Sequence, residues 1–303
     1  MTLHQLRIFL AVAEFKSFTQ AGLQLKMSQP DVSLHVRNLE NEIGLRLFER
    51  AGKRVYLTQA GEVLREKASL LFSQLRDIEQ ALAEVKGLLR GSLLIGASTT
   101  VGLYVLSRPV AEFRERYPGI DVQLKLANTG PVERMVLAME VDIGFTLGIP
   151  IPEVGFQKFI EDEIVLILPP DHRLCKKNNI RVKDLDKETF VIREPGSMTR
   201  RVFDELFSKS ESRPPIFMEL DSIQSIKWAV AEGYGISLVP RHAALSRNKS
   251  PRVCVRRLND FDFPCPVNVI WNSKRKLSPA AEAFLDVARK HAASLEKARG
   301  RRA

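Results

Sequence analysis

The segment from Ser17 to Arg37 contains two helix-start signals at close spacing. Ser17 and Gln20 fit a capping box, in which side chains satisfy the free amides of a first helical turn. Ser28 repeats the signal with Asp31 three residues later. The residues in between leave room for only a short helix and a tight turn. The segment therefore predicts a helix-turn-helix, whose second helix enters the DNA major groove.

The second helix and the residues after it supply side chains that suit nucleic acid. We expect Gln29, Ser33, His35 and Arg37 to form a polar face that contacts bases. The stretch ERAGKRVYLT at 49–58 predicts two short extended pieces, a wing whose cations contact phosphates. The alternative is a small helical domain whose polar face is merely solvated. The expected DNA-binding residues are Ser17, Thr19, Ser28, Gln29, Pro30, Ser33, His35, Arg37, Arg50, Lys53 and Arg54.

Two later turns carry hydroxyl groups that could bind an anion. Residues 98–100 (STT) and 196–199 (GSMT) each follow an expected strand and precede an expected helix. Backbone N–H groups at a helix N-terminus favour anions, and ligands of open α/β sheets bind outside the carboxyl ends of the strands. We expect a small anionic effector to contact Ser98, Thr99, Thr100, Asn128, Thr129, Thr146, Ser197 and Thr199.

The alternative for these hydroxyls is simple helix capping, a routine role of Ser and Thr. Two matched turns favour binding over capping. Arg200 could supply a counter-charge, although an exposed helix arginine explains it equally well.

Three helices must position the DNA-contacting residues. The spacing predicts a first helix over 3–15, and Gly44 fits a left-handed residue that ends the third. The apolar residues expected in the core are Leu6, Phe9, Leu10, Ala13, Leu23, Leu25, Val32, Val36 and Leu39.

A long helix is predicted from its cap at Thr58 to Lys86. Its apolar residues alternate at steps of four and three, which is the seam of a coiled coil: Leu64, Ala68, Leu71, Leu75, Ile78, Leu82, Val85 and Leu89. The seam could pack against the C-terminal domain of the same chain or against a second copy. A strict 3.5-residue period favours the second copy, and a homodimer would read two half-sites of an imperfect palindrome.

From Ser92 onward, short apolar runs alternate with helical stretches, the pattern of an α/β fold. Residues 161–170 (EDEIVLILPP) extend toward a second lobe, and 266–272 (PVNVIWN) return to the first. Two lobes with a cleft between them would bring the two hydroxyl turns face to face.

The composition agrees with a nucleic-acid partner. The formal charge is +10 and the pI about 9.6, which favours a polyanion through counterion release. The sequence has no apolar run of the ~20 residues that span a membrane, and its amphipathic N-terminus differs from a signal peptide. Cys175, Cys254 and Cys265 are odd in number and lack C-x-x-C spacing. We therefore expect thiols rather than a disulfide framework, and a cytoplasmic protein.

Two other functional classes have weaker support. An enzyme would be indicated by a Walker loop, an H-E-x-x-H motif or a Cys/His cluster, and the sequence has none of these. We therefore expect no catalytic residue, metal or cofactor. A solute-binding protein would need an export signal and no DNA-binding module, the reverse of what this sequence offers.

The residues of the first sixty positions resemble the winged helix-turn-helix of LysR-type transcriptional regulators. The matching positions include Ser17-Phe18-Thr19, Ala21, Ser28-Gln29-Pro30, Leu39-Glu40, Leu47-Phe48, Leu57-Thr58 and Ala60-Gly61. The resemblance implies a DNA-binding domain at 1–58, a dimerisation helix at 59–90 and an effector domain at 91–303. It also implies a periplasmic-binding-protein-like fold, with lobe I at about 91–162 and 267–303 and lobe II at about 163–266. A tetramer built from two dimers and RNA polymerase as a partner are implied as well. Gly22 and Asp31 depart from the family pattern, where alanine and a small apolar residue are usual.

The stretch IGASTTVG…YVL, which begins at Ile95, resembles a subgroup with regulators of sulfur assimilation and carbon fixation. That resemblance implies effectors such as sulfur oxyanions, phosphorylated metabolites or small carboxylates. Met198 stands where glycine is common, and Ser107 lies near a position that is often proline.

Overall fold

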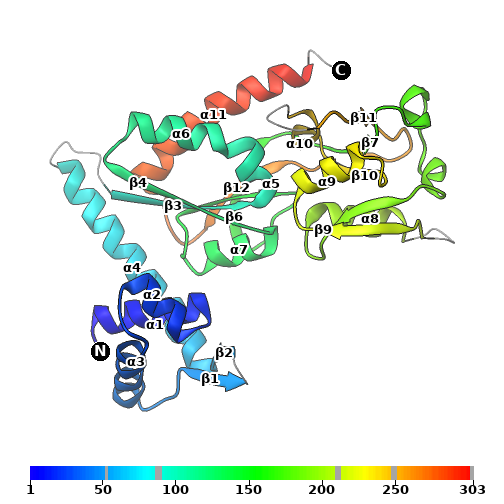
Figure 1. Ribbon diagram of the computed structural model, residues 1–303. Helices are drawn as coiled ribbons and strands as arrows, with labels where there is room; N and C mark the ends of the chain where they lie inside the picture. The colour runs from blue at the N-terminus through cyan, green and yellow to red at the C-terminus, as the bar shows by residue number, and fades with distance from the viewer. Residues whose placement is uncertain (52–53, 86–90, 209–212, 247–250, 301–303) are drawn as a thin grey trace. The chain divides into compact units, whose positions relative to one another are not determined.

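A computed structural model of the chain describes residues 1–51, 54–85, 91–208, 213–246 and 251–300 (Figure 1). By its internal contacts the chain divides into two units. The first comprises Met1–Leu82 with Ala138–Glu140, and the second comprises Ala83–Leu137 with Val141–Ala303. Within the described ranges, no helix combines the length and the apolar character needed to cross a bilayer.

The first unit is a winged helix-turn-helix followed by a long helix, as predicted. Ser17 Oγ accepts a hydrogen bond from Gln20 N (3.3 Å) at the start of the second helix, and Ser28 Oγ accepts one from Asp31 N (3.3 Å) at the start of the third. Gly44, with φ +75°, ends the third helix. The elements are α1 (Leu3–Phe15), α2 (Phe18–Leu25), α3 (Gln29–Ile43), β1 (Phe48–Ala51), β2 (Arg54–Leu57) and α4 (Gln59–Val85).

The core of the three helices differs from the prediction at one residue. Leu23 is 69% exposed, so its assignment to the core is wrong. Phe18, Ala21 and Leu25 form the packed side of α2, at the i, i+3, i+7 spacing of one helical face. Leu23 lies two residues from Ala21 and Leu25, and side chains two residues apart on a helix point to different sides.

The long helix α4 leaves part of its apolar seam exposed within this chain. Ala68 is buried, whereas Leu71, Ile78 and Leu82 are exposed. The side chain of Val85 and the whole of Leu89 lie outside what the structure describes. The dimerisation predicted for this seam stays a prediction.

The second unit has two lobes, each built on β-strands with helices against them (Figure 1). We call lobe I the part built on the five-stranded sheet of order β4-β3-β5-β12-β6, in which β3 pairs in parallel with β4 and β5. Helices α6 and α11 cover one face of this sheet and α7 the other. Its strands are β3 (Gly91–Ser98), β4 (Ile120–Ala127), β5 (Ile143–Leu147), β6 (Val154–Ile160) and β12 (Val267–Asn272). Its helices are α5 (Thr99–Val101), the π-helix η1 (Gly102–Leu106), α6 (Ser107–Arg116), α7 (Thr129–Leu137) and α11 (Pro279–Gly300).

Lobe II contains an antiparallel sheet of order β10-β7-β11 and a parallel pair, β8 with β9. A bridge between Phe190 and Ile236 connects the pair to the segment that leads into β10. Its strands are β7 (Ile164–Leu168), β8 (Phe190–Arg193), β9 (Ile216–Leu220), β10 (Ser237–Pro240) and β11 (Cys254–Arg256). Its helices are η2 (Arg173–Lys176), η3 (Val182–Leu185), α8 (Met198–Leu206), α9 (Ile223–Ala231) and α10 (Arg241–Leu245).

The two segments that cross between the lobes lie side by side, because Glu163 and Pro264 form an antiparallel bridge. Strands β6 and β11 were not predicted from the sequence. The middle of β6 is exposed, so it lacks the apolar alternation that signals a half-buried strand. Strand β11 has only three residues.

The cysteines correct the expectation of unpaired thiols. Cys175 and Cys254 form a disulfide with their Cα atoms 6.2 Å apart, and Cys265 is free and buried. The pair is separated by 79 positions, and it forms because η2 packs beside β11. Spacing along the sequence gave no sign of this proximity. Burial raises the pKa of the Cys265 thiol.

Candidate functional sites

The side of α3 that we expect to contact DNA carries polar residues spaced by four. Gln29 Nε2 donates a hydrogen bond to Ser33 Oγ (2.7 Å), and Arg37 lies one further turn along the same face. Gln29, Pro30 and Arg37 are exposed, and Ser33 is half-buried. The face therefore presents an amide, a hydroxyl and a guanidinium, the groups that read base edges in the major groove.

His35 does not belong to this face. It lies two residues from both Ser33 and Arg37, and residues at that spacing do not face one another on a helix. Its half-buried ring packs edge-on against His4 of α1, with the ring centroids 5.0 Å apart. The expectation that all four polar residues share a face is therefore wrong for His35.

Leu34 is a residue of this face that the sequence analysis missed. It is 55% exposed and lies four positions after Pro30 and three before Arg37, so it adjoins these two residues on the outer side of α3. A helical projection of 29–43 would have placed it there. Apolar side chains in the major groove contact the methyl group of thymine.

The turn before α3 is tight. Met27 N donates to Gly22 O (2.9 Å), and a Cβ on Gly22 would meet Met27 O at 2.8 Å. The glycine at this position therefore fits the close approach of the turn to α2. Of the other expected DNA-binding residues, Thr19 and Ser28 are exposed, and Ser17 is half-buried at its cap.

The wing forms as an antiparallel pair in which Glu49 faces Tyr56 and Arg50 faces Val55. Arg50 and Arg54 lie on its two strands, but their side chains are not among those that the structure describes. Lys53 lies outside the described residues. Contacts of these three cations with phosphates stay a prediction.

In the second unit, the two hydroxyl turns meet at a small cavity between the lobes. Its volume is about 10 Å³, roughly what a single water molecule needs. The expected effector residues line it with the exception of Thr146, which is fully buried in β5 with an unpartnered hydroxyl. The lining residues are Ser98, Thr99, Thr100, Asn128, Thr129, Leu147, Arg193, Ser197, Met198 and Thr199. We call this space the inner cavity.

The hydroxyl groups of the two turns differ in their hydrogen-bond partners. Ser197 Oγ caps α8 by accepting a hydrogen bond from Arg200 N (3.2 Å). The hydroxyls of Ser98 and Thr199 are buried and have no hydrogen-bond partner within the described chain. A buried polar group without a partner costs free energy. Helix capping therefore accounts for Ser197 and leaves Ser98 and Thr199 without a structural role.

Arg193 is the charged residue of the inner cavity, and the sequence analysis missed it. Its side chain, at the end of β8, is only 4% exposed. Burial raises the pKa of Tyr104 while the nearby Arg193 charge opposes that rise. The available signal was a charged pair, Arg193-Glu194, at the carboxyl end of a buried strand, the place where open α/β sheets bind ligands.

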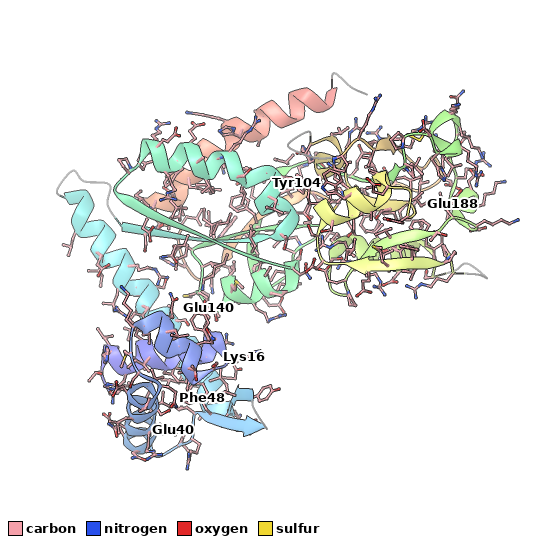
Figure 2. All side chains as sticks on the ribbon, viewed as in Figure 1. Lys16, Glu40, Phe48, Tyr104, Glu140 and Glu188 are labelled. Carbon is pink, nitrogen blue, oxygen red and sulfur yellow. A yellow bond between two sulfur atoms is a disulfide. The ribbon has the colours of Figure 1, made fainter. Side chains whose placement is uncertain are left out.

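Two side-chain hydrogen bonds join the lobes across this region. Asn128 Nδ2, from the end of β4, donates to Glu194 Oε1 (2.9 Å) just after β8. The Tyr104 hydroxyl donates to Gln224 Oε1 of α9 (3.1 Å), and Figure 2 shows Tyr104 where lobe I faces lobe II. Direct contacts therefore hold the two lobes together beside the inner cavity.

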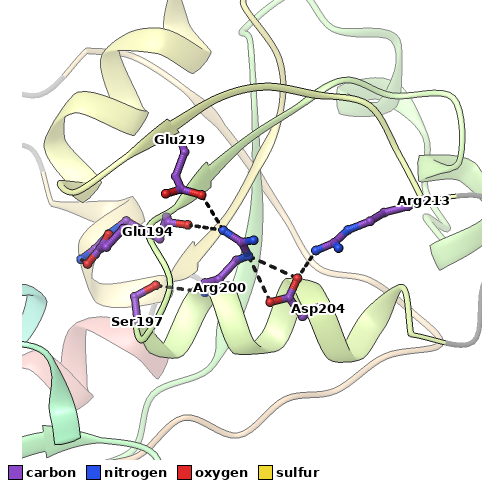
Figure 3. A network of polar contacts seen from close by, with 7 residues as sticks. Glu194, Ser197, Arg200, Asp204, Arg213 and Glu219 are labelled. Carbon is purple, nitrogen blue, oxygen red and sulfur yellow. Dashed lines mark hydrogen bonds and ion pairs between the residues drawn. The ribbon is translucent and has the colours of Figure 1, made fainter.

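Arg200 is not a free counter-charge for a ligand. Its guanidinium pairs with Asp204 Oδ2 (3.0 Å) and Glu219 Oε2 (2.7 Å), and Asp204 also pairs with Arg213 (Figure 3). Burial lowers the pKa of Arg200, but these two carboxylates outweigh it and raise the pKa overall. The network ties α8 to β9 and gives Arg200 a structural role.

A larger cavity of about 480 Å³ adjoins the inner one and shares Thr129, Ser197 and Met198 with it. That volume is typical of small-molecule pockets. Glu133 lines it and accepts a hydrogen bond from Ile151 N (3.1 Å), and burial raises the pKa of this carboxyl. The larger cavity offers space for the body of a small molecule, and the inner cavity at its side carries the buried charge of Arg193. Among the described residues, no cluster of His, Cys, Asp and Glu could hold a metal ion.

Comparison with known protein families assigns both units. Residues 3–62 match the bacterial regulatory helix-turn-helix protein family of the lysR type, and residues 86–293 match the LysR substrate binding domain. The chain is a LysR-type transcriptional regulator. A RuBisCO operon transcriptional regulator from Allochromatium vinosum is 36% identical over 297 residues, which cover 97% of this chain and 98% of that protein. The matched families and relatives of this LysR-type regulator are transcriptional regulators rather than enzymes.

Solved structures of LysR-type regulators share this fold. A full-length single-residue variant of OxyR from Pseudomonas aeruginosa has a TM-score of 0.71 at 24% identity, and the comparison covers 95% of this chain and 98% of that one. The regulatory domain of CcmR from Synechocystis PCC6803, in complex with 2-PG, has a TM-score of 0.60 at 30% identity. That comparison covers 66% of this LysR-type regulator and 96% of the CcmR domain.

Proposed function

We propose that this LysR-type regulator controls transcription in response to a small anion bound between lobes I and II. It binds an imperfect palindromic operator as a homodimer, which assembles into a homotetramer, and it acts on RNA polymerase in the cytoplasm. The division into a DNA-binding part (1–58), a linker helix (59–90) and an effector part (91–303) belongs to this proposal.

The inner cavity supports the anionic effector. Arg193 brings a buried positive charge, and Ser98 and Thr199 bring buried hydroxyls without partners. A charge in a site of low polarity needs a counter-charge, which Glu194 supplies in the structure and which an anion can replace, and unpartnered hydroxyls need an acceptor. A phosphate or carboxylate group satisfies both requirements at once. This combination of groups is the observation that carries the proposal.

The larger cavity suggests what else the effector contains. A phosphorylated or sulfated metabolite, or a small dicarboxylate, could place its anionic end at Arg193 and the rest beside Met198. The CcmR regulatory domain was solved with 2-PG, a small anion of this class. We therefore take 2-phosphoglycolate and inorganic phosphate as the first probes.

Calorimetric titration of the full chain at constant ionic strength tests this proposal. We expect saturable binding of 2-phosphoglycolate, with chloride as the reference. Replacing Ser98 and Thr199 by alanine together should weaken binding at least tenfold, because each hydroxyl contributes on the order of 1 kcal/mol. The control is Thr146→Ala, which removes a buried unpartnered hydroxyl that does not line the cavity. An equal loss of affinity in the double variant and in Thr146→Ala, or no binding by the wild type, would overturn the proposal.

For DNA, we propose that Gln29, Ser33, Leu34 and Arg37 read base edges from one face of α3. Pro30 and Ser28 position the start of that helix, and Thr19 and the cap at Ser17 position α2. His35 holds α3 against α1 through His4 rather than contacting bases. The cations of the wing, Arg50, Lys53 and Arg54, bind phosphates.

For assembly, we propose that α4 pairs with its copy in a second chain. The exposed Leu71, Ile78 and Leu82 support this pairing, because apolar side chains at coiled-coil spacing are stabilised by burial against a partner helix. The seam predicted from the sequence also includes Leu64, Ala68, Leu75, Val85 and Leu89, of which Ala68 is already buried within the single chain.

A further inference from the structure

Glu194 lies at the point where the lobes close over the inner cavity. Its carboxylate accepts two parallel hydrogen bonds from Arg193, at 2.6 Å from Nε and 2.8 Å from Nη2. It accepts a third from Asn128 Nδ2 at 2.9 Å. Fork-like pairing of this kind is the geometry in which arginine recognises carboxylates and phosphates.

The groups that Glu194 occupies are groups of the effector site. Arg193 and Asn128 both line the inner cavity, one from each lobe. A bound anion would need their N–H groups, and the five N–H donors of arginine act in a fixed plane. In the structure, two of these donors and one from Asn128 are already directed at Glu194.

The size of the inner cavity also limits what can bind without a change in these contacts. About 10 Å³ admits no more than one water molecule, so a phosphate or carboxylate group requires the lobes or the side chains to move. Of the two side-chain hydrogen bonds named above between the lobes, the one at this cavity is Asn128 to Glu194. An opening of the lobes at this cavity therefore breaks this bond.

We propose that Glu194 is an internal competitor of the effector: its carboxylate holds Arg193 and Asn128 until an anionic ligand displaces it. This inference rests on the proposed function and adds a residue that sets both the affinity and the anion selectivity of the cleft. In the structure Glu194 neutralises the buried guanidinium and ties lobe I to lobe II. When an anion takes its place, Glu194 is released toward solvent, where its side chain is already 25% exposed.

The electrostatics of Glu194 agree with this role. Burial alone would raise the pKa of its carboxyl, but the hydrogen bonds from Arg193 and Asn128 outweigh burial and lower the pKa overall. Glu194 is therefore ionised at neutral pH and carries the charge of the anion that it replaces. A dianion such as phosphate competes better than a monoanion, because it offers Arg193 and the unpartnered hydroxyls more charge and more acceptors.

The variant Glu194→Gln tests the proposal. Glutamine keeps the size of the side chain but removes the charge, so it competes poorly for Arg193. We expect the full-length variant to bind inorganic phosphate and 2-phosphoglycolate at least fivefold more tightly than the wild type, measured by calorimetry at constant ionic strength. The matched control is Glu219→Gln, which removes the same charge from the adjacent strand β9, where Glu219 pairs with Arg200 (Figure 3). This control should bind with the affinity of the wild type.

The outcomes separate this inference from the proposed function. If the wild type binds the anions and Glu194→Gln binds them equally or more weakly, Glu194 is a structural residue or a part of the binding site, and the inference fails alone. If both charge-removing variants gain affinity equally, the effect is general electrostatics, and the inference again fails. If the wild type binds neither anion, the proposed function fails and this inference with it.

Discussion

Asn128 and Glu194, 66 positions apart in sequence, form a 2.9 Å hydrogen bond that joins the two lobes beside the inner cavity. Because Glu194 also pairs with Arg193, the closure of the lobes and the state of the buried charge are linked. A ligand can shift a conformational equilibrium only if it interacts differently with the two states. An anion that competes for Arg193 and Asn128 meets this condition.

Replacing Asn128 by aspartate tests this link. Two carboxylates in contact disfavour joint ionisation, so the pKa of Glu194 should rise in the folded protein. Stability is then lost as the pH rises through that raised pKa. We expect the free energy of unfolding to fall by about 1–2 kcal/mol at pH 8 and by less at pH 5, measured with urea at both pH values. Asn128→Ala should lower the free energy of unfolding by the same amount at both pH values. If Asn128→Asp also lowers it equally at pH 5 and pH 8, the link between the two residues is contradicted.

On α3, the double variant Ser33→Ala with Arg37→Ala should bind the DNA upstream of its own gene at least a hundredfold more weakly. Each base contact is worth about 1–3 kcal/mol. Fluorescence anisotropy across a salt series measures the affinity and its salt dependence. The control is Arg7→Ala, which removes one exposed positive charge from α1, over the ring of Phe72. If this control loses as much affinity as the double variant, α3 is not the reading helix.

The exposed seam of α4 predicts a dimer that depends on apolar contacts. Ile78→Asp combined with Leu82→Asp places charges at positions that are 56% and 61% exposed in the single chain, so the chain should still fold. Sedimentation at micromolar concentration should then show monomers, with weaker promoter binding. The conservative pair Ile78→Leu with Leu82→Met should stay oligomeric. A double-aspartate protein that still dimerises would remove α4 from the interface.

Lys227 gives a pH-dependent prediction for lobe II. Its side chain is fully buried in α9, and its Nζ donates to the carbonyls of Ala243 (2.8 Å) and Ser246 (3.0 Å). Burial lowers the pKa of Lys227 to about 8. Between this value and the ordinary value of 10.5, the unfolded chain binds a proton that the folded chain releases. The contribution of Lys227 to stability therefore rises with pH in that window.

Comparison with Lys227→Met isolates this group, because all other titrations cancel. The free energy of unfolding of the wild type minus that of the variant should become more positive by up to about 1.4 kcal/mol per pH unit between pH 8 and 10. Urea unfolding at several pH values measures it. A difference that is constant with pH would show that Lys227 titrates normally in the folded protein.

Local features of the first unit could be predicted from the sequence because their causes lie within a few residues. The caps at Ser17 and Ser28 each join atoms three positions apart, and Gly44 ends α3 through its own backbone conformation. The same reasoning predicted both hydroxyl turns. Each turn follows a short apolar run that is typical of a strand and precedes residues with the spacing of a helix. The predictions were wrong at Leu23 and His35. At these positions, the side of the helix that faces the core decides whether a side chain is exposed or packed.

The sequence by itself determined the family, most of the order of helices and strands, and most of the residues around the inner cavity. Only the tertiary structure decided that Arg193 is buried, that Glu194 holds it, and that Asn128 completes the contact from the other lobe. It also paired Cys175 with Cys254. The physical reason is distance along the chain. Hydrogen bonds within a turn follow from spacing, whereas burial and contacts between remote positions depend on how whole segments pack.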